Sequence, residues 1–268
     1  MEEQEAVQKE FDRFCLEKEK DSLEEAVRKI SRIIRRAQEL EKGYLGKTVS
    51  FNHIVEYYYY TYYECNGEFR CAKTSINRMY RELAHIYQKA GDKINAERAY
   101  KKCLQWDPVD GEAYLELAQI YKETGNLKDV LKTSQLAYKY CNSRPLLAGY
   151  YRNLGFYYLE CYQPELSRAL YEYSECYSKT QCAQNELEYL ASAMGWTMKR
   201  MEKDELLRKL KESHIPVDFA PVTVALTYKA AKMEEKIGHT AEALECYELF
   251  YHQLFQKDDI EKHSNYKI

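Results

Sequence analysis

Residues 77–110 read NRMYRELAHIYQKAGDKINAERAYKKCLQWDPVD, and residues 111–144 read GEAYLELAQIYKETGNLKDVLKTSQLAYKYCNSR. The two segments align without a gap, so that equivalent positions of the two segments lie 34 residues apart. The matched positions are Tyr80, Leu83, Ala84, Tyr87 and Gly91 in the first segment and Tyr114, Leu117, Ala118, Tyr121 and Gly125 in the second. A period of this length predicts a chain built from consecutive helical hairpins.

The residue types at the matched positions explain how such a hairpin forms. The aromatic, leucine and alanine positions are three or four residues apart, which places them on one face of a helix. We expect Ala84 to lie where two helices pack closely, and Gly91 to end the first helix in a left-handed turn. Pro108 ends the second helix, and Asp110 can cap the next one. One hairpin cannot bury its own apolar face, so successive hairpins must stack.

The pattern resembles the tetratricopeptide repeat, which has an aromatic residue, leucine, a small residue, tyrosine, glycine, a small residue, an aromatic residue, a small residue and proline. In the first segment these positions are Tyr80, Leu83, Ala84, Tyr87, Gly91, Ala96, Tyr100, Cys103 and Pro108. The second segment departs near its end, where Ser134 and Asn142 replace the aromatic residue and the proline. The resemblance implies an all-α fold, a right-handed superhelical solenoid of about five to six antiparallel helical hairpins.

Weaker copies of the pattern extend it toward the carboxyl terminus, and we expect one continuous solenoid domain. Its parts are N-terminal helices with a degenerate first hairpin (1–76), repeats at 77–110, 111–144, 148–181, 186–223 and 224–257, and a polar tail at 258–268. Within the first part, the sequence predicts helices at 2–18, 22–40 and 51–65, a loop at 43–47, and a long helix at 68–90 that runs into the first clear repeat. The helix at 51–65 holds six tyrosines within 57–63, and it is either buried or a contact surface.

Composition limits the classes of function. The 268 residues are 31% charged and 45% hydrophobic, which is typical of a soluble folded protein, and the net charge of −3 gives no electrostatic reason to expect nucleic acid or an anionic membrane as partner. Nine cysteines without a Cys-x-x-Cys pair suit free thiols, so we expect a reducing cytoplasmic location. The acidic amino terminus does not resemble a signal peptide, and no apolar run is long enough to span a membrane.

The sequence shows no catalytic constellation. The six histidines have no paired spacing for a metal, and no phosphate-binding glycine loop or nucleophile elbow occurs. We therefore expect no enzymatic activity, no metal and no cofactor.

The resemblance instead points to a surface. In this family the first helix of each hairpin lines the concave face, and its side chains between the core positions contact ligands. Carried over position by position, the predicted partner-binding residues are Arg78, Arg81, His85, Gln119, Lys122, Arg152, Asn153, Phe156, Met194, Tyr228 and Lys232. These positions change from basic to apolar along the chain, which suggests a peptide or helix with acidic residues at one end and apolar anchors at the other.

The sequence therefore predicts a non-catalytic scaffold or adaptor that binds a protein or peptide, and two other readings stay open. One is a peptide-responsive regulator that acts through a partner, since only about 21 residues precede the first long apolar helix, too few for a helix-turn-helix domain. The other is a structural subunit of a larger assembly that uses the tyrosine-rich helix as its contact. The sequence does not indicate an oligomeric state.

Overall fold

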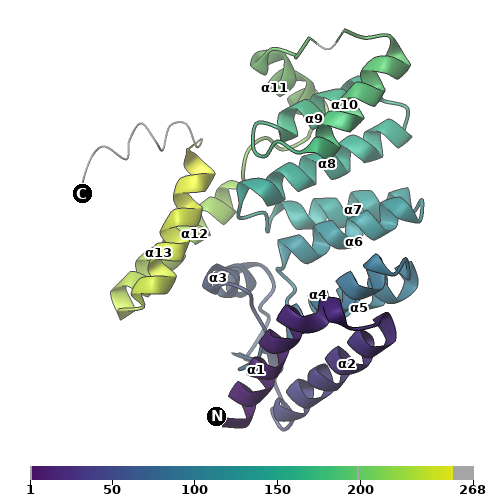
Figure 1. Cartoon of the computed structure of the whole chain (residues 1–268). Helices are drawn as coiled ribbons and strands as arrows, with labels where there is room; N and C mark the ends of the chain where they lie inside the picture. The colour runs from purple at the N-terminus through teal and green to yellow at the C-terminus, as the bar shows by residue number, and fades with distance from the viewer. Residues whose placement is uncertain (1, 198, 256–268) are drawn as a thin grey trace. The chain divides into compact units, whose positions relative to one another are not determined.

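The computed structural model describes residues 2–197 and 199–255, and the expected polar tail at 258–268 lies outside them. The described residues fold into helices joined by short turns, with one small sheet, which confirms the all-α solenoid class (Figure 1). The chain divides into two compact units, and the division falls between Ile120 and Tyr121. We describe each unit by itself.

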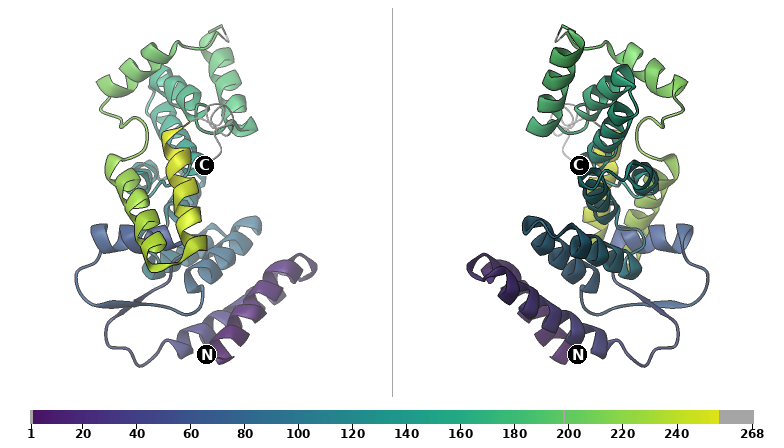
Figure 2. Two further views of the ribbon diagram at one scale, coloured as in Figure 1. Left: turned by 90° about the vertical axis from the view of Figure 1, so that its left-hand side faces the viewer. Right: turned by 90° about the vertical axis from the view of Figure 1, so that its right-hand side faces the viewer.

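The first unit contains three helices ahead of the repeat and the repeat itself. Its helices are α1 (Glu2–Glu17), α2 (Leu23–Leu40), α3 (Ile54–Tyr63), α4 (Ile76–Lys89), α5 (Lys93–Trp106) and most of α6 (Gly111–Glu123). Helices α1 and α2 run side by side (Figure 2), α2 also packs on α4, and α4 pairs with α5. The predicted helices at 2–18 and 22–40 are confirmed, and the Ser22 hydroxyl caps α2 by accepting from the Glu25 amide.

Residues 41–75, which we call the insert, contain a strand–helix–strand unit around α3. Strand β1 (Lys47–Val49) pairs in parallel with β2 (Phe69–Cys71), with Thr48 opposite Arg70. The prediction of one helix at 68–90 is therefore wrong. Tertiary contacts override the helical pattern here, because the Phe69 ring packs 4.8 Å from the Tyr60 ring of α3 and the Arg70 guanidinium donates to the Glu41 carbonyl oxygen at 2.7 Å.

The tyrosine-rich helix α3 divides into a buried and an exposed side. Tyr59 and Tyr60 are almost completely buried, whereas Tyr57 and Tyr62 are 37% and 62% exposed. The helix thus contributes to the core and also presents aromatic side chains to solvent, which combines the two readings that the sequence left open.

The hairpin of α4 and α5 forms as its sequence predicts. Ala84 and Ala99 are buried in it, and Gly91 joins the two helices with φ at +75°. An L-residue with a side chain rarely adopts this conformation, so glycine is the suitable residue there. Asp92 then caps α5 by accepting from the Asn95 amide at 3.1 Å, and Asp110 caps α6 by accepting from the Ala113 amide at 2.9 Å.

The second unit continues the alternation of helices. It contains α7 (Leu127–Tyr138), α8 (Arg144–Glu160), α9 (Pro164–Ser174), α10 (Gln181–Met194), α11 (Lys203–Glu212), α12 (Pro221–Ile237) and α13 (Thr240–Leu254). Helix α7 packs on α8, α8 pairs with α9, and α12 pairs with α13, while α10 and α11 both pack on α9. The exact repeat boundaries stay predictions.

Tyrosines form much of the core of the second unit. The Tyr151 and Tyr173 rings meet edge to face at 4.8 Å, and the Tyr173 hydroxyl donates to the Asp218 carboxylate at 3.0 Å. The Tyr151 hydroxyl reaches the Pro216 carbonyl oxygen at 3.1 Å. Each ring therefore fills apolar space between helices while its hydroxyl finds a polar partner, which is how a core can hold so many tyrosines.

Candidate functional site

The predicted partner-binding residues of the first unit lie on α4 and α6, with different freedom to contact a ligand. Arg78 is exposed. Arg81 is half-buried, because its guanidinium contacts the Glu112 carboxylate at 2.5 Å and the Asp110 carboxylate at 3.4 Å. His85 packs edge-on against the Tyr100 ring at 5.9 Å, and Gln119 is half-buried on α6.

Three of the predicted residues of the second unit lie close to partners within that unit. The Lys122 ammonium lies 5.3 Å from the centre of the Phe156 ring, so the structure brings these two predicted residues together. Arg152 is half-buried, with its guanidinium 3.5 Å from the Ser178 carbonyl oxygen. Asn153 is buried at 6% exposure, so little of its side chain is open to a ligand.

The remaining predicted residues lie at the surface of the second unit. Met194 is exposed and lines a cleft of about 530 Å³ together with Trp196. Tyr228 packs against the Phe250 ring at 4.9 Å and is still 45% exposed. Lys232 is exposed on α12, where it pairs with Glu235 at 2.7 Å.

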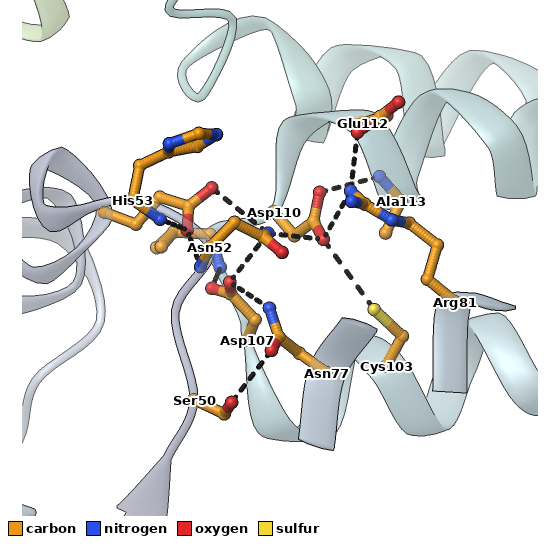
Figure 3. Close-up of polar contacts among 12 residues, drawn as sticks. Ser50, Asn52, His53, Asn77, Arg81, Cys103, Asp107, Asp110, Glu112 and Ala113 are labelled. Atoms are coloured by element: carbon orange, nitrogen blue, oxygen red, sulfur yellow. Dashed lines mark hydrogen bonds and ion pairs between the residues drawn. The ribbon is translucent and has the colours of Figure 1, made fainter. Parts of the chain in front are cut away.

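Next to Arg81 lies a feature that the sequence did not predict. The Asp107 and Asp110 carboxyls (Figure 3) gather with that of Glu56 around the Asn52 side chain, where the insert meets the repeat. We call Glu56, Asp107 and Asp110 the acidic cluster. All three are buried, with exposures of 4%, 0% and 1%. Burying a carboxylate is costly unless it is hydrogen-bonded or neutralised, so the surroundings must compensate.

Local backbone structure positions each member of the acidic cluster. Glu56 stands in the first turn of α3, where its carboxylate accepts from the backbone amides of Asn52 at 2.6 Å and His53 at 3.1 Å. Asp107 follows the end of α5 and accepts from the Val109 amide. Asp110 is the cap of α6. Two of the carboxyls therefore serve helix starts, and the third closes a turn.

Two asparagine side chains donate into the acidic cluster. The Asn52 amide nitrogen lies 3.0 Å from Asp110, 3.4 Å from Asp107 and 3.4 Å from Glu56. The Asn77 amide nitrogen donates to Asp107 at 3.1 Å, and its oxygen accepts from the Ser50 hydroxyl at 2.8 Å. Residues of the insert and of α4 thus share one hydrogen-bond network with the loop before α6.

The surroundings raise the pKa values of two members of the acidic cluster. Burial, followed by the charge of Asp110, raises the pKa of Glu56 to about 7. Burial, followed by the charge of Glu56, raises the pKa of Asp107 well above its ordinary value. Neighbouring carboxylates cannot all ionise cheaply in a buried site, so the cluster keeps a proton that isolated carboxyls would lose.

Among residues 2–197 and 199–255, no three His, Cys, Asp or Glu side chains are placed to hold a metal ion together. Within the same residues, no helix has both the length and the apolar character needed to cross a bilayer.

Sequence reasoning identified the Asp110 cap and missed the rest of the acidic cluster. A usable signal was the Glu56 side chain three residues after His53, the spacing at which a helix start can be capped. Nothing in the sequence shows that this capping residue lies against Asp107.

The comparisons with known proteins include one family match. Residues 78–110 match the family model of the tetratricopeptide repeat. No curated protein matches the chain. Among solved structures, a crystal structure of MamA protein is 19% identical with a TM-score of 0.37, covering 72% of this chain and 96% of that one. A crystal structure of PilW, a widely conserved type IV pilus biogenesis factor, is 18% identical with a TM-score of 0.40, covering 70% of this chain and 82% of that one.

The family match falls on the segment where the sequence pattern is strongest and on the hairpin of α4 and α5. Residues 78–110 are therefore a tetratricopeptide repeat, and the chain is similar to tetratricopeptide repeat proteins.

Proposed function

We propose that the chain is a non-catalytic protein-interaction scaffold that binds a peptide or partner helix through the first helices of its repeats. The repeat at 78–110 supports a role of the protein–protein interaction kind. We further propose which surface of this chain binds the partner and what chemistry the partner has.

One observation carries the choice of surface. On α4, Met79, Leu83 and Ala84 are buried, whereas Arg78 beside them is exposed and His85 keeps partial access to solvent. A helix that fills the core with one face and leaves long polar side chains on the other is suited to contact a ligand.

The exposed residues at the predicted positions suggest the partner's chemistry. In the first unit, Arg78 is cationic and exposed, and acidic residues of a partner would complement it. In the second unit, taken by itself, Met194 and Tyr228 are about 45% exposed and would accept apolar anchors, whereas the exposed Lys232 already pairs with Glu235. Arg81 is already paired with Glu112, so we expect it to orient the surface more than to bind.

The cysteines bear on the compartment in which we propose that the protein acts. All nine are free thiols. Free thiols in such number fit a reducing compartment, so the proposal places the protein in the cytoplasm.

Affinity capture from a lysate of the native host, with quantitative mass spectrometry, tests the proposal. We expect the wild-type chain to retain a partner that a double variant, Arg78→Glu with Tyr228→Ala, loses by about tenfold or more. Both side chains are exposed, so circular dichroism should show that the variant folds.

The matched control is Arg13→Glu with Tyr62→Ala. Arg13 is an exposed residue of α1, and Tyr62 is 62% exposed on α3. We expect this control to retain the partner. If the control loses the partner and the test variant keeps it, the contact lies on α1 or α3 and the proposed surface is wrong.

A further inference from the structure

We propose that a cleft in the second unit is a separate binding site for an acidic peptide segment. The cleft lies between the end of α9, the loop that follows it, and the first turns of α10 and α11, and its volume is about 1010 Å³. Four cationic side chains line it, Arg144, Lys179, Arg200 and Lys203, and we call it the basic cleft. None of its lining residues belongs to the predicted partner surface, so the inference stands apart from the proposed function.

The two carboxylates of the basic cleft are already neutralised. Glu172 is buried and accepts from the Arg168 guanidinium at 2.8 Å and from the Met201 backbone amide at 2.7 Å. Glu175 pairs with Arg200 at 2.5 Å. Neither carboxylate therefore cancels the remaining positive charge of the cleft.

The remaining cations fall into two kinds. The Arg144 guanidinium lies 5.0 Å from the centre of the Tyr177 ring and donates to the Cys176 carbonyl oxygen, so it is held in place. Lys179 and Lys203 are exposed, and neither makes an ion pair with any other residue that the structure describes. Two unpaired ammonium groups in one cleft with a fixed guanidinium are a pattern that an anionic ligand would complete.

Helix α10 adds to the positive electrostatic potential of the basic cleft. It begins at Gln181, and Gln181 and its cap Thr180 both line the cleft. The amino end of a helix carries partial positive charge, which favours a carboxylate nearby. The cleft thus reverses locally the net charge of −3 that the chain carries as a whole.

The form of the basic cleft favours a peptide over a compact anion. Its cations come from three segments of chain and line a space of about 1010 Å³, which has room for several carboxylates of one peptide. Both arginines already contact protein groups, Arg144 the Cys176 carbonyl oxygen and Arg200 the Glu175 carboxylate, so fewer of their N–H donors are available to a phosphate. Exposed lysines act as separate point charges, and they match carboxylates spaced along a peptide.

Fluorescence anisotropy with a fluorescein-labelled oligoglutamate peptide tests the proposal, with an oligolysine peptide as the probe of opposite charge. We expect the full chain to bind oligoglutamate, and a Lys179→Glu, Lys203→Glu double variant to bind about tenfold more weakly or worse. The matched control is Lys211→Glu with Lys229→Glu, which changes the net charge equally through two exposed lysines outside the cleft. We expect that control to bind like the wild-type chain.

Alkylation of cysteines locates the peptide. Cys176 is exposed and lines the basic cleft, whereas Cys71 is exposed in the first unit. Bound oligoglutamate should slow the reaction of Cys176 with iodoacetamide and leave Cys71 unchanged, as measured by mass spectrometry.

Three results would overturn the proposal. The first is that the wild-type chain does not bind oligoglutamate. The second is that the cleft variant and the control bind it equally well. The third is that inorganic phosphate displaces the peptide much more effectively than free glutamate does, which would make the cleft a site for a compact phosphate. None of these results depends on Arg78 or Tyr228, so failure here is distinguishable from failure of the proposed function.

Discussion

Replacing Glu56 with glutamine should make the first unit more stable at high pH, because it replaces a buried ionisable group with a neutral one of the same shape. The pKa of Glu56 lies at about 7 in the folded state, where burial and then the charge of Asp110 raise it, against an ordinary value of 4.5. A raised carboxyl pKa means that the folded state holds the proton longer than the unfolded state. Its contribution to stability is full below about pH 4.5 and is lost as the pH rises through about 7.

The magnitude follows from the same shift. Between pH 5 and pH 8 the wild-type chain should lose about 2–3 kcal/mol of unfolding free energy through Glu56 alone. Asp107 adds a loss of the same sign, because its pKa is raised by burial first and by Glu56 second. In the Glu56→Gln variant, the amide oxygen of the new side chain can still accept from the Asn52 and His53 amides, and the side chain does not ionise.

Urea denaturation at pH 5 and pH 8 measures the effect. The chain has two tryptophans, Trp106 and Trp196, so fluorescence in a Trp196→Phe background reports on the first unit. Trp106 is suitable because its carbonyl oxygen accepts from the Ser50 amide of the insert at 2.9 Å. At pH 5 we expect the free energy of unfolding of Glu56→Gln to be within about 1 kcal/mol of that of the Trp196→Phe background. At pH 8 we expect it to be about 2 kcal/mol higher than that of the background.

The control is Glu17→Gln, since Glu17 is exposed and makes no side-chain hydrogen bond or ion pair within the described part of the chain. It should keep the pH dependence of the background. An equal difference between Glu56→Gln and the background at both pH values would refute the reasoning, because the acidic cluster would then not hold the extra proton.

The other predictions concern close packing and capping. Ala84→Leu should lower the unfolding free energy by about 1–3 kcal/mol, since Ala84 is completely buried, and an unchanged melting temperature would contradict the close contact at this position. Gly155→Ala should cost about as much, because the new Cβ would lie 2.9 Å from the buried Tyr171 ring. Calorimetry should show the loss, and Tyr171→Leu should relieve it in the double variant. Asp110→Ala should cost about 1–2 kcal/mol through the lost cap of α6, whereas a melting temperature equal to that of the wild-type chain would show that the cap is dispensable.

The sequence predicted best where local pattern and tertiary packing agree. In the repeat, Ala84 is small because it is buried, and Gly91 takes the left-handed conformation, so periodicity alone locates both helices. The same logic placed α2, for which either Asp21 or Ser22 was a possible cap, and the structure shows that Ser22 is the cap. These features depend on residues that are close in the chain.

The insert shows where such reasoning fails. Nothing local to Phe69 and Arg70 indicates a strand, because their contacts are with Tyr60 of helix α3 and with Glu41, which is 29 positions away from Arg70. The sequence did not predict the acidic cluster for the same reason. Asn52 contacts Asp107 across 55 positions and Asp110 across 58, and no periodic pattern relates such residues.

The insert also sets the limits of the smallest piece of this chain that can fold. A fragment cut at residue 77, where the repeat begins in the sequence, would expose Asp107 and leave Asn77 without its Ser50 partner. Asp110 would still cap α6 in this fragment, but its carboxylate would lose the hydrogen bond from the Asn52 side-chain amide. We therefore expect the unit of repetition and the unit of folding to be different stretches of this chain, so that gaining or losing a repeat at this end would have to include the insert as well.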